Sequence, residues 1–109
     1  MNPIYQNKCN VTNDGVYLRG WPNGTISVYQ DLVELHYKTL KMFFRSKIHD
    51  RVLPKDQITN IYIDNYNALF TQTSNGVSVK IQVEIWGGSS ALKKLGEALK
   101  QAGFAVETP

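Results

Sequence analysis

The stretch from Asn23 to Tyr37 constrains the fold of this chain more than any other. It contains two runs rich in β-branched and aromatic residues, separated by a polar Gln30-Asp31 break. Successive side chains of a strand point to opposite faces, so Ile26 and Val28 share one face of the first run. On the second run the residues that share a face are Val33, Leu35 and Tyr37. The pattern predicts two antiparallel strands, each with one buried face.

Length and composition indicate a single globular domain. The chain has 109 residues, of which 42% are hydrophobic and 19% are charged, and this size leaves room for one hydrophobic core. Its uncharged runs are much shorter than the ~20 apolar residues of a membrane helix. The first residues lack a signal-peptide pattern, and a single cysteine, Cys9, excludes an intrachain disulfide. We therefore expect a cytoplasmic domain.

Alternation elsewhere predicts further strands. We expect residues 1–13 to form a flexible lead-in and residues 14–109 to form the domain. The additional strands are expected at residues 15–21, 40–48, 57–63, 68–73 and 77–85. Arg51-Val52-Leu53-Pro54 is a short segment whose proline cannot donate a ladder hydrogen bond, which places it at a strand end or edge. Asn75-Gly76 is the strongest hairpin signal in the chain.

A change of period after Gly87-Gly88 predicts a C-terminal helix. Its apolar positions follow the i, i+3, i+4, i+7 spacing of an amphipathic helix, and they are Leu92, Leu95, Gly96 and Leu99. We expect Ser89 or Ser90 to cap its N-terminus and Gly103 to end it. Trp86, at the junction of strand and helix, is expected to pack under Leu92 or Leu95. Trp21 is expected to fill an end of the same core.

These elements predict a mainly β protein with one C-terminal helix. Several antiparallel strands leave open edges, and small proteins commonly remove them by curling the sheet into a barrel. We expect a β-barrel or orthogonal sandwich of about seven antiparallel strands, with the amphipathic helix capping one end.

Two segments of the sequence resemble a known family. The runs at 23–33 and 51–61, together with Leu53, Pro54 and Ile58, are similar to short bacterial pleckstrin-homology-like domains, relatives of the GRAM type. The last strand, Trp86 and the terminal helix match the order of elements in that group, so the resemblance covers about residues 14–103. It implies the pleckstrin-homology superfold and a binding module rather than an enzyme.

The resemblance does not extend to the phosphoinositide-binding members of the superfold. Those members carry a lysine, followed by a basic-x-arginine pair, around the first hairpin loop. Here that region offers only Arg19, and the next turn carries Gln30 and Asp31. Specific recognition of an inositol phosphate is therefore not expected.

Basic residues concentrate between Lys38 and Lys55, where six lysines and arginines are opposed only by Asp50. The segment carries a net charge of about +5, although the whole chain carries +3. On the strand expected at 40–48, alternation places Lys41, Phe43, Arg45 and Lys47 on one side, and Leu40, Met42, Phe44 and Ile48 on the other. The candidate binding residues are therefore Lys38, Lys41, Phe43, Arg45, Lys47 and Arg51. The alternative interpretation is a solvated strand face whose lysines discourage edge aggregation.

Two hypotheses of function follow. The first is a non-enzymatic adaptor that binds a protein or peptide partner, by strand addition to a sheet edge or in a groove. The second is electrostatic association of residues 38–55 with an anionic surface, either acidic lipid or nucleic acid. His36, His49 and Cys9 show no metal-ligand spacing, and no catalytic or cofactor-binding motif occurs. We therefore expect no catalytic residues, no metal and no cofactor. The sequence leaves the oligomeric state open.

Overall fold

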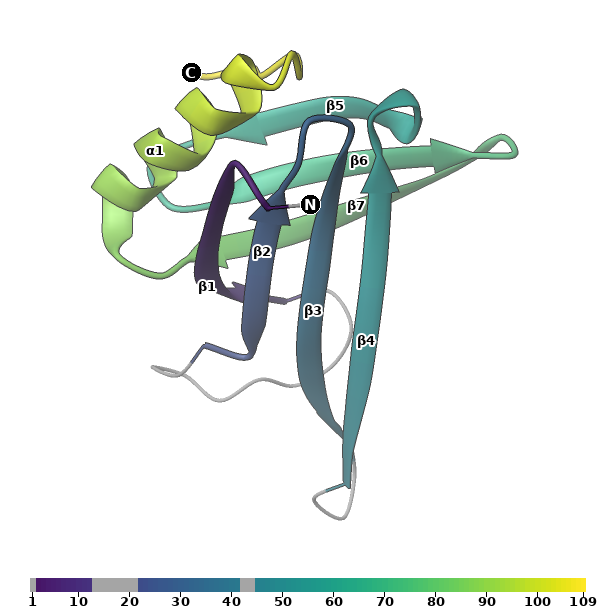
Figure 1. Ribbon diagram of the computed structural model, residues 1–109. Coiled ribbons are helices and arrows are strands. Elements are labelled where there is room, and N and C mark those ends of the chain that lie inside the picture. Colours follow the sequence, from purple (N-terminus) through teal and green to yellow (C-terminus); the bar gives the residue numbers. More distant parts are fainter. Residues whose placement is uncertain (1, 13–21, 42–44) are drawn as a thin grey trace.

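The computed structural model describes residues 2–12, 22–41 and 45–109, with the backbone alone at residues 40, 41, 45 and 46. Within these ranges the chain forms seven strands, a short 3-10 helix and one α-helix (Figure 1). The elements are β1 Tyr5–Val11, β2 Gly24–Val28, β3 Leu32–Lys41, β4 Arg45–Pro54, η2 Lys55–Gln57, β5 Ile58–Ile63, β6 Ala68–Ser74, β7 Val77–Ile85 and α1 Gly88–Gln101. None of the described helices combines the length and apolarity that a membrane span requires.

The strands form one antiparallel sheet in the order β4-β3-β2-β1-β7-β6-β5. The sheet folds at β1, which pairs with β2 from Tyr5 to Cys9 and with β7 from Cys9 to Val11. In Figure 1, β2, β3 and β4 cross β5, β6 and β7 at a steep angle. The two halves enclose one core, which confirms the expected mainly β, pleckstrin-homology-like orthogonal sandwich with a C-terminal helix.

The expectation of a closed barrel is wrong. β4 and β5 lie at opposite ends of the strand order and do not pair with each other. β5 is instead bridged by the C-terminal segment, where Tyr62 and Glu107 form a parallel bridge. The sheet therefore keeps two separate edges.

The central hairpin has the predicted register and faces. β2 and β3 pair from Gly24 opposite Tyr37 to Val28 opposite Val33, and the chain bends at Gln30 and Asp31. The residues predicted to face inward are all buried: Ile26, Val28, Val33, Leu35 and Tyr37. Period-two alternation was sufficient here because one face of each strand packs on the core.

The prediction of a flexible lead-in over residues 1–13 is wrong. β1 lies inside the sheet, and its Cys9 and Val11 are fully buried. The asparagines of this segment argued against a strand, because asparagine usually occurs in turns. Here the Asn10 Oδ1 accepts the Asn23 N–H at 2.8 Å, and the Asn23 side chain bonds to both backbone groups of Val11. These bonds satisfy amides that would otherwise be costly to bury.

The segment predicted as one strand at residues 40–48 belongs to two strands. β3 ends at Lys41, β4 begins at Arg45, and these two residues are cross-strand partners. No glycine, proline, asparagine or aspartate marks the reversal between them. The usual turn signals are therefore missing, and the alternation continues across the reversal. The strand predicted at residues 15–21, including Trp21, lies outside the described residues.

The last three strands follow the prediction closely. η2 precedes β5, so the strand begins at Ile58 rather than at residue 57. Asn75 and Gly76 join β6 to β7 with φ values of 53° and 79°, and a two-residue turn of this kind requires positive φ at both positions. Val77 and Val79 are exposed, because the first half of β7 extends beyond the core.

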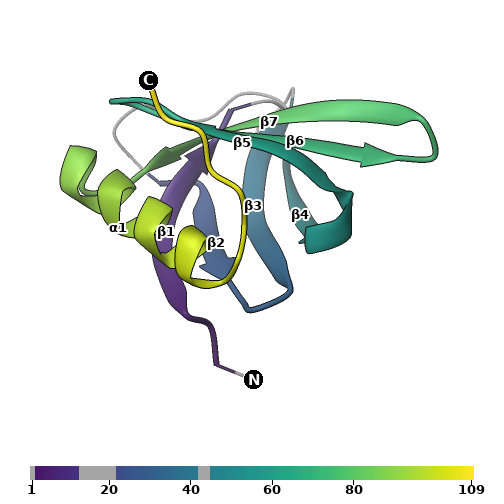
Figure 2. The same ribbon diagram turned by 90° about the horizontal axis from the view of Figure 1, so that it is seen from above.

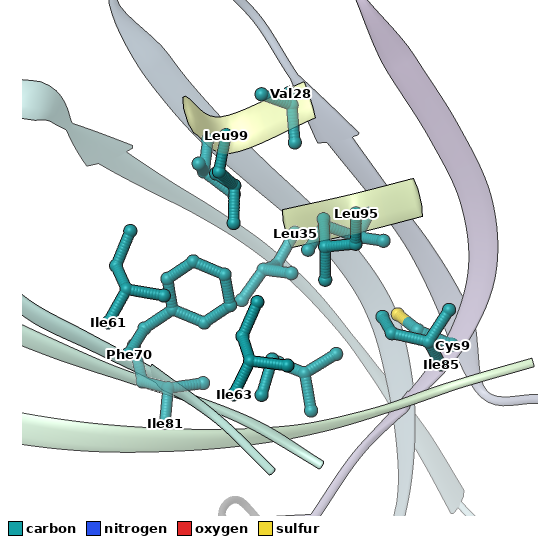
Figure 3. Packing of buried hydrophobic residues seen from close by; sticks show 14 of the residues in the cluster. Cys9, Val28, Leu35, Ile61, Ile63, Phe70, Ile81, Ile85, Leu95 and Leu99 are labelled. Atoms are coloured by element: carbon teal, nitrogen blue, oxygen red, sulfur yellow. The ribbon is translucent and has the colours of Figure 1, made fainter. Parts of the chain in front are cut away.

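The helix α1 closes the open side of the sandwich. Leu95 and Leu99 are fully buried, and Figure 3 shows them above Leu35, Phe70 and Ile63. This confirms the predicted apolar stripe. Gly96 sits on the same side, where an added Cβ would lie 3.4 Å from the Ile63 side chain.

The two ends of α1 differ in how well they were predicted. Gly103 has a φ of 89°, and the Phe104 N–H donates to the Leu99 carbonyl at 2.9 Å, which confirms the glycine helix stop. At the other end, Gly87 rather than Ser89 or Ser90 precedes the helix, with a φ of 109° and no side-chain cap. The serine-cap prediction is wrong because the left-handed turn at Gly87-Gly88 starts the helix earlier.

Candidate functional site

The strand β4 forms an outer edge of the sheet. It pairs with β3 over ten residues, from Leu32 opposite Pro54 to Lys41 opposite Arg45. Pro54 is its last residue, which confirms the placement of that proline at a strand end. Edge strands expose backbone groups that can pair with another chain.

The hydrogen-bond pattern indicates which groups of β4 face away from the sheet. In an antiparallel ladder, residues that bond to the neighbouring strand alternate with residues whose N–H and C=O point the other way. The Lys55 N–H donates to the Asp31 carbonyl at 2.9 Å, in the register of the β3–β4 ladder. Odd-numbered residues of β4 therefore bond to β3. The amide and carbonyl groups of Ile48, Asp50 and Val52 point outward.

One of these outward groups already has a partner. The Val52 carbonyl accepts a 3.4 Å hydrogen bond from Nε2 of Gln72 on β6. Among the residues that the structure describes, no backbone group pairs with the outward groups of Ile48 and Asp50. The centre of β4 therefore offers two N–H donors and two carbonyl acceptors to another chain.

The two faces of β4 differ in chemistry. Odd-numbered residues share the face that holds the buried Leu53, and the charged side chains of this face are Lys47 and Arg51. We call them the basic row. Their cross-strand partners, Thr39 and Leu35, carry no charge. The even face instead carries exposed apolar side chains, Ile48 at 57% and Val52 at 46%.

Side-chain contacts fix β4 to β3. The ring of His49 stacks on Tyr37 with centroids 4.8 Å apart, and its Nε2 lies 2.8 Å from the hydroxyl of the buried Thr39. On the other face, the Nδ1 of His36 pairs with the Asp50 carboxylate. The edge is therefore held rigidly by its own hairpin, which favours addition of a strand over rearrangement.

The opposite edge of the sheet is covered by the chain itself. After α1, the C-terminal segment runs back beside β5 (Figure 2). Phe104 is buried there, and the ammonium of Lys55 lies 4.9 Å from the centre of its ring. The same ammonium donates to the Ala102 carbonyl. Of the two edges, β5 is occupied and the centre of β4 is exposed.

The structure does not assemble the candidate binding residues into a single row on one strand. Lys38 is exposed, but it lies on the even face of the ladder, opposite the basic row. Lys41 and Arg45 face each other as backbone partners on two strands. Lys47 and Arg51 do share one face, while Phe43 lies outside the described residues. The alternative of a merely solvated face remains for Lys38.

Two features of this edge were not predicted as binding elements. Ile48 was predicted on the apolar side of the 40–48 strand, yet it is exposed, because the even-numbered residues of β4 lie on the face opposite the buried Leu53. The sequence indicated Asp50 only as the acidic residue within the basic segment, and the structure shows that it supplies outward backbone groups in mid-strand. The signal available for both was Pro54, which marks an edge strand.

Other surface features lie away from this edge. Trp86 does not fill the core as expected, because it is 41% exposed and lines a depression of about 360 Å³ with Tyr66 and Leu92. A second depression, of about 300 Å³, lies between Lys8 and Lys38. No three histidine, cysteine, aspartate or glutamate side chains of the described ranges gather as a metal site would require.

Cys9 has an environment that suppresses reactivity. It is fully buried, and burial raises the pKa of its thiol to about 12. Thiolates, not thiols, act as nucleophiles, so this cysteine is inert in the folded protein. Its interpretation as part of a mobile segment is therefore wrong.

Comparison with known proteins adds no further constraint. No model of a known protein family matches this chain, and no curated protein shows significant similarity to it.

Proposed function

We propose that this protein is a non-enzymatic binding module that takes an extended segment of a protein or peptide partner as an additional strand on β4. The observation that carries the proposal is the outward-facing, unpaired backbone at Ile48 and Asp50. Strand addition obtains affinity from main-chain hydrogen bonds and specificity from side chains at alternate positions. The strand order and C-terminal helix also support the resemblance to pleckstrin-homology-like domains, which we retain as part of the proposal.

The test replaces Ile48 with proline. Ile48→Pro removes an outward N–H that β3 does not use, so the β3–β4 ladder keeps its hydrogen bonds. Ile48→Thr is the matched control, because it removes the same apolar side chain and keeps the N–H. Peptides would be selected from a random display library with the wild-type protein and then measured on both variants.

The expected peptides bind the wild-type protein and Ile48→Thr, and they lose about tenfold or more in affinity on Ile48→Pro. Thermal unfolding of each variant verifies that it is folded. Failure to recover any peptide, or equal affinity for the proline variant, would show that β4 does not accept a strand.

A second candidate function has its own observation. The β3–β4 ladder pairs Lys41 with Arg45 and Thr39 with Lys47, and it pairs Lys38 with Ile48. The end of the hairpin that lies farthest from Pro54 therefore contains four basic residues, Lys38, Lys41, Arg45 and Lys47. We infer that this end could associate with an anionic surface, either acidic lipid or nucleic acid.

Sedimentation with vesicles containing phosphatidylserine, and gel shift with double-stranded DNA, test this second function. Binding should fall steeply between about 50 and about 500 mM salt, since screened charges interact weakly. The double variant Lys38→Glu/Lys47→Glu should abolish it, whereas Lys93→Glu/Lys100→Glu on α1 should not. Absence of binding to both probes at low salt would eliminate this function.

A further inference from the structure

We propose that the end of the β6–β7 hairpin contacts the partner strand on β4, and that this strand carries apolar side chains on the face that continues the core. This inference rests on the proposed function and specifies the chemistry of its ligand. It follows from the position of the hairpin, whose tip extends past β4 in Figures 1 and 2.

The end of the hairpin presents two exposed valines on its inward face. Because side chains alternate along a strand, Val77 and Val79 share the face of Ile81, which is buried in the core. Val77 is 63% exposed and Val79 is 41% exposed. The face that covers the core at Ile81 therefore continues outward as an apolar surface.

One contact places this surface beside the outward edge of β4. Gln72 of β6 is the cross-strand partner of Val79, so the two side chains lie on the same face of the hairpin. The Nε2 of Gln72 donates to the Val52 carbonyl at 3.4 Å and to Oε1 of Gln57 at 2.8 Å. That carbonyl is one of the groups of β4 that point away from β3. Val79 therefore lies next to the space that an added strand would occupy.

The two layers of the sandwich end at different places. Within the described residues, β4 is the last strand of the layer that contains β2 and β3, whereas the hairpin of the other layer extends further. Packed sheets bury the side chains between them at a separation of about 10 Å. A strand added to β4 would extend its layer beneath Val77 and Val79. Apolar side chains on that strand would then be removed from water, which is favourable.

Register identifies the ligand residues that face the hairpin. In an antiparallel pair, directly opposite residues place their side chains on the same side of the sheet. Odd-numbered positions of β4 face the core, so ligand residues opposite Arg51 and Leu53 point toward the hairpin. Ligand residues opposite Ile48 and Val52 lie on the outer face, beside side chains that are 57% and 46% exposed. The ligand end that pairs near Val52 should therefore be the more apolar end.

The occupant of this surface is an extended chain rather than a helix or a small apolar molecule. The outward N–H and C=O groups of Ile48 and Asp50 lie on the same edge of β4 as the carbonyl that Gln72 contacts. Only a main chain in the extended conformation offers donors and acceptors at the spacing of this edge. Main-chain groups and apolar side chains thus point to one ligand, an extended apolar segment.

Peptides selected from a random heptapeptide display library with the wild-type protein test the inference. Their affinities are measured by fluorescence anisotropy on the wild-type protein and on Val77→Thr/Val79→Thr, which keeps β-branched side chains of similar size and makes them polar. Ile4→Thr is the matched control, because Ile4 is a β-branched residue that is 39% exposed and precedes β1, three strands away from β4. Thermal unfolding verifies that each variant is folded.

We expect the selected peptides to carry apolar residues at alternate positions near one end. Their affinity should fall about tenfold on Val77→Thr/Val79→Thr and should change less than about twofold on Ile4→Thr. Replacing the apolar peptide residues with threonine should weaken binding to the wild-type protein about tenfold. The same replacement should weaken binding to Val77→Thr/Val79→Thr much less, because the effects of groups in contact are not additive.

The outcomes separate the inference from the function on which it rests. Unchanged affinity on Val77→Thr/Val79→Thr, with loss on Ile48→Pro, would overturn the hairpin contact and leave strand addition intact. Loss on the valine variant without loss on Ile48→Pro would indicate apolar binding without strand pairing and would overturn both. Failure to select any peptide would also overturn both. A concentration-dependent dimer in sedimentation, abolished by Val77→Thr/Val79→Thr, would show that the occupant is a second copy and would overturn the inference.

Discussion

Glu107 donates its backbone N–H to the carbonyl of Ile61 at 2.8 Å, and its own carbonyl accepts the N–H of Ile63 at 2.9 Å. The chain thereby pairs one edge of its sheet with its own C-terminal segment. The other edge, at the centre of β4, has no such partner within the described residues. This asymmetry is why we assign partner binding to β4 rather than to β5.

The anchoring of the C-terminal segment is tested at Phe104. Phe104→Ala should lower the free energy of unfolding by about 3–5 kcal/mol, because a buried aromatic ring is replaced by a cavity. Urea denaturation measures the change, and Ala105→Ser, at the exposed neighbouring position, is the control. A loss below about 1 kcal/mol would indicate that the segment is only loosely attached to the core.

Leu95 tests whether α1 is part of the core. Leu95→Ala should cost about 2–5 kcal/mol, since the side chain is fully buried between the helix and both halves of the sheet. The exposed neighbour Lys94→Ala should change stability by less than about 0.5 kcal/mol. Similar small effects for both variants would mean that the helix is peripheral.

Gly24 is required by the close approach of β2 and β3. A Cβ at this position would lie 2.1 Å from the carbonyl oxygen of His36, which is backbone and cannot easily move. Gly24→Ala should therefore destabilise the protein by about 1–3 kcal/mol. Gly96→Ala is the contrasting variant, because it meets only van der Waals contact and should be neutral or stabilising by up to about 1 kcal/mol. Thermal unfolding of both variants decides whether the two glycines differ as expected.

The pKa of Cys9 makes stability depend on pH in the alkaline range. The thiol pKa is 9.0 in an unperturbed chain and about 12 in the folded protein. Between these values the unfolded chain has released its proton and the folded chain has kept it. Unfolding therefore becomes more favourable as pH rises above about 9, by about 1.4 kcal/mol per pH unit from this group.

Comparison of the wild-type protein with Cys9→Ala isolates that contribution. The loss of stability between pH 9 and pH 11 should be steeper in the wild-type protein. A thiol reagent at pH 8 should label Cys9 only after unfolding in guanidinium. Rapid labelling of the folded protein, or identical pH slopes, would contradict the buried position of the thiol.

The fold was largely predictable because its core follows simple periods. Alternation assigned the inward faces of β2 and β3, and the leucine spacing assigned α1. It failed at β1, where the side chains of Asn10 and Asn23 bond to the backbone of Asn23 and Val11, and at the β3–β4 reversal, whose sequence lacks turn residues. Closure of the sheet was also misjudged, because the pairing of Glu107 with β5 depends on contacts distant in the sequence.

The candidate site was harder to predict than the fold. The basic character of the segment around Lys47 was evident from the sequence, but its distribution over two faces depends on the β3–β4 register. Exposed backbone groups, such as those of Ile48, are indicated by the sequence only indirectly, through Pro54 at the end of the edge strand. Trp86 was predicted to be buried because its side chain is large and mainly apolar. Its position after the last strand instead leaves it at the surface.

The central claim is that the outward backbone groups of Ile48 and Asp50 are unpaired, and amide hydrogen exchange of the unliganded protein tests it most directly. We predict alternating protection along β4, with fast exchange at Ile48 and Asp50 and slow exchange at His49 and Arg51, whose amides bond to β3. Slow exchange at all four amides would mean that this edge is already covered, and strand addition to it would be contradicted.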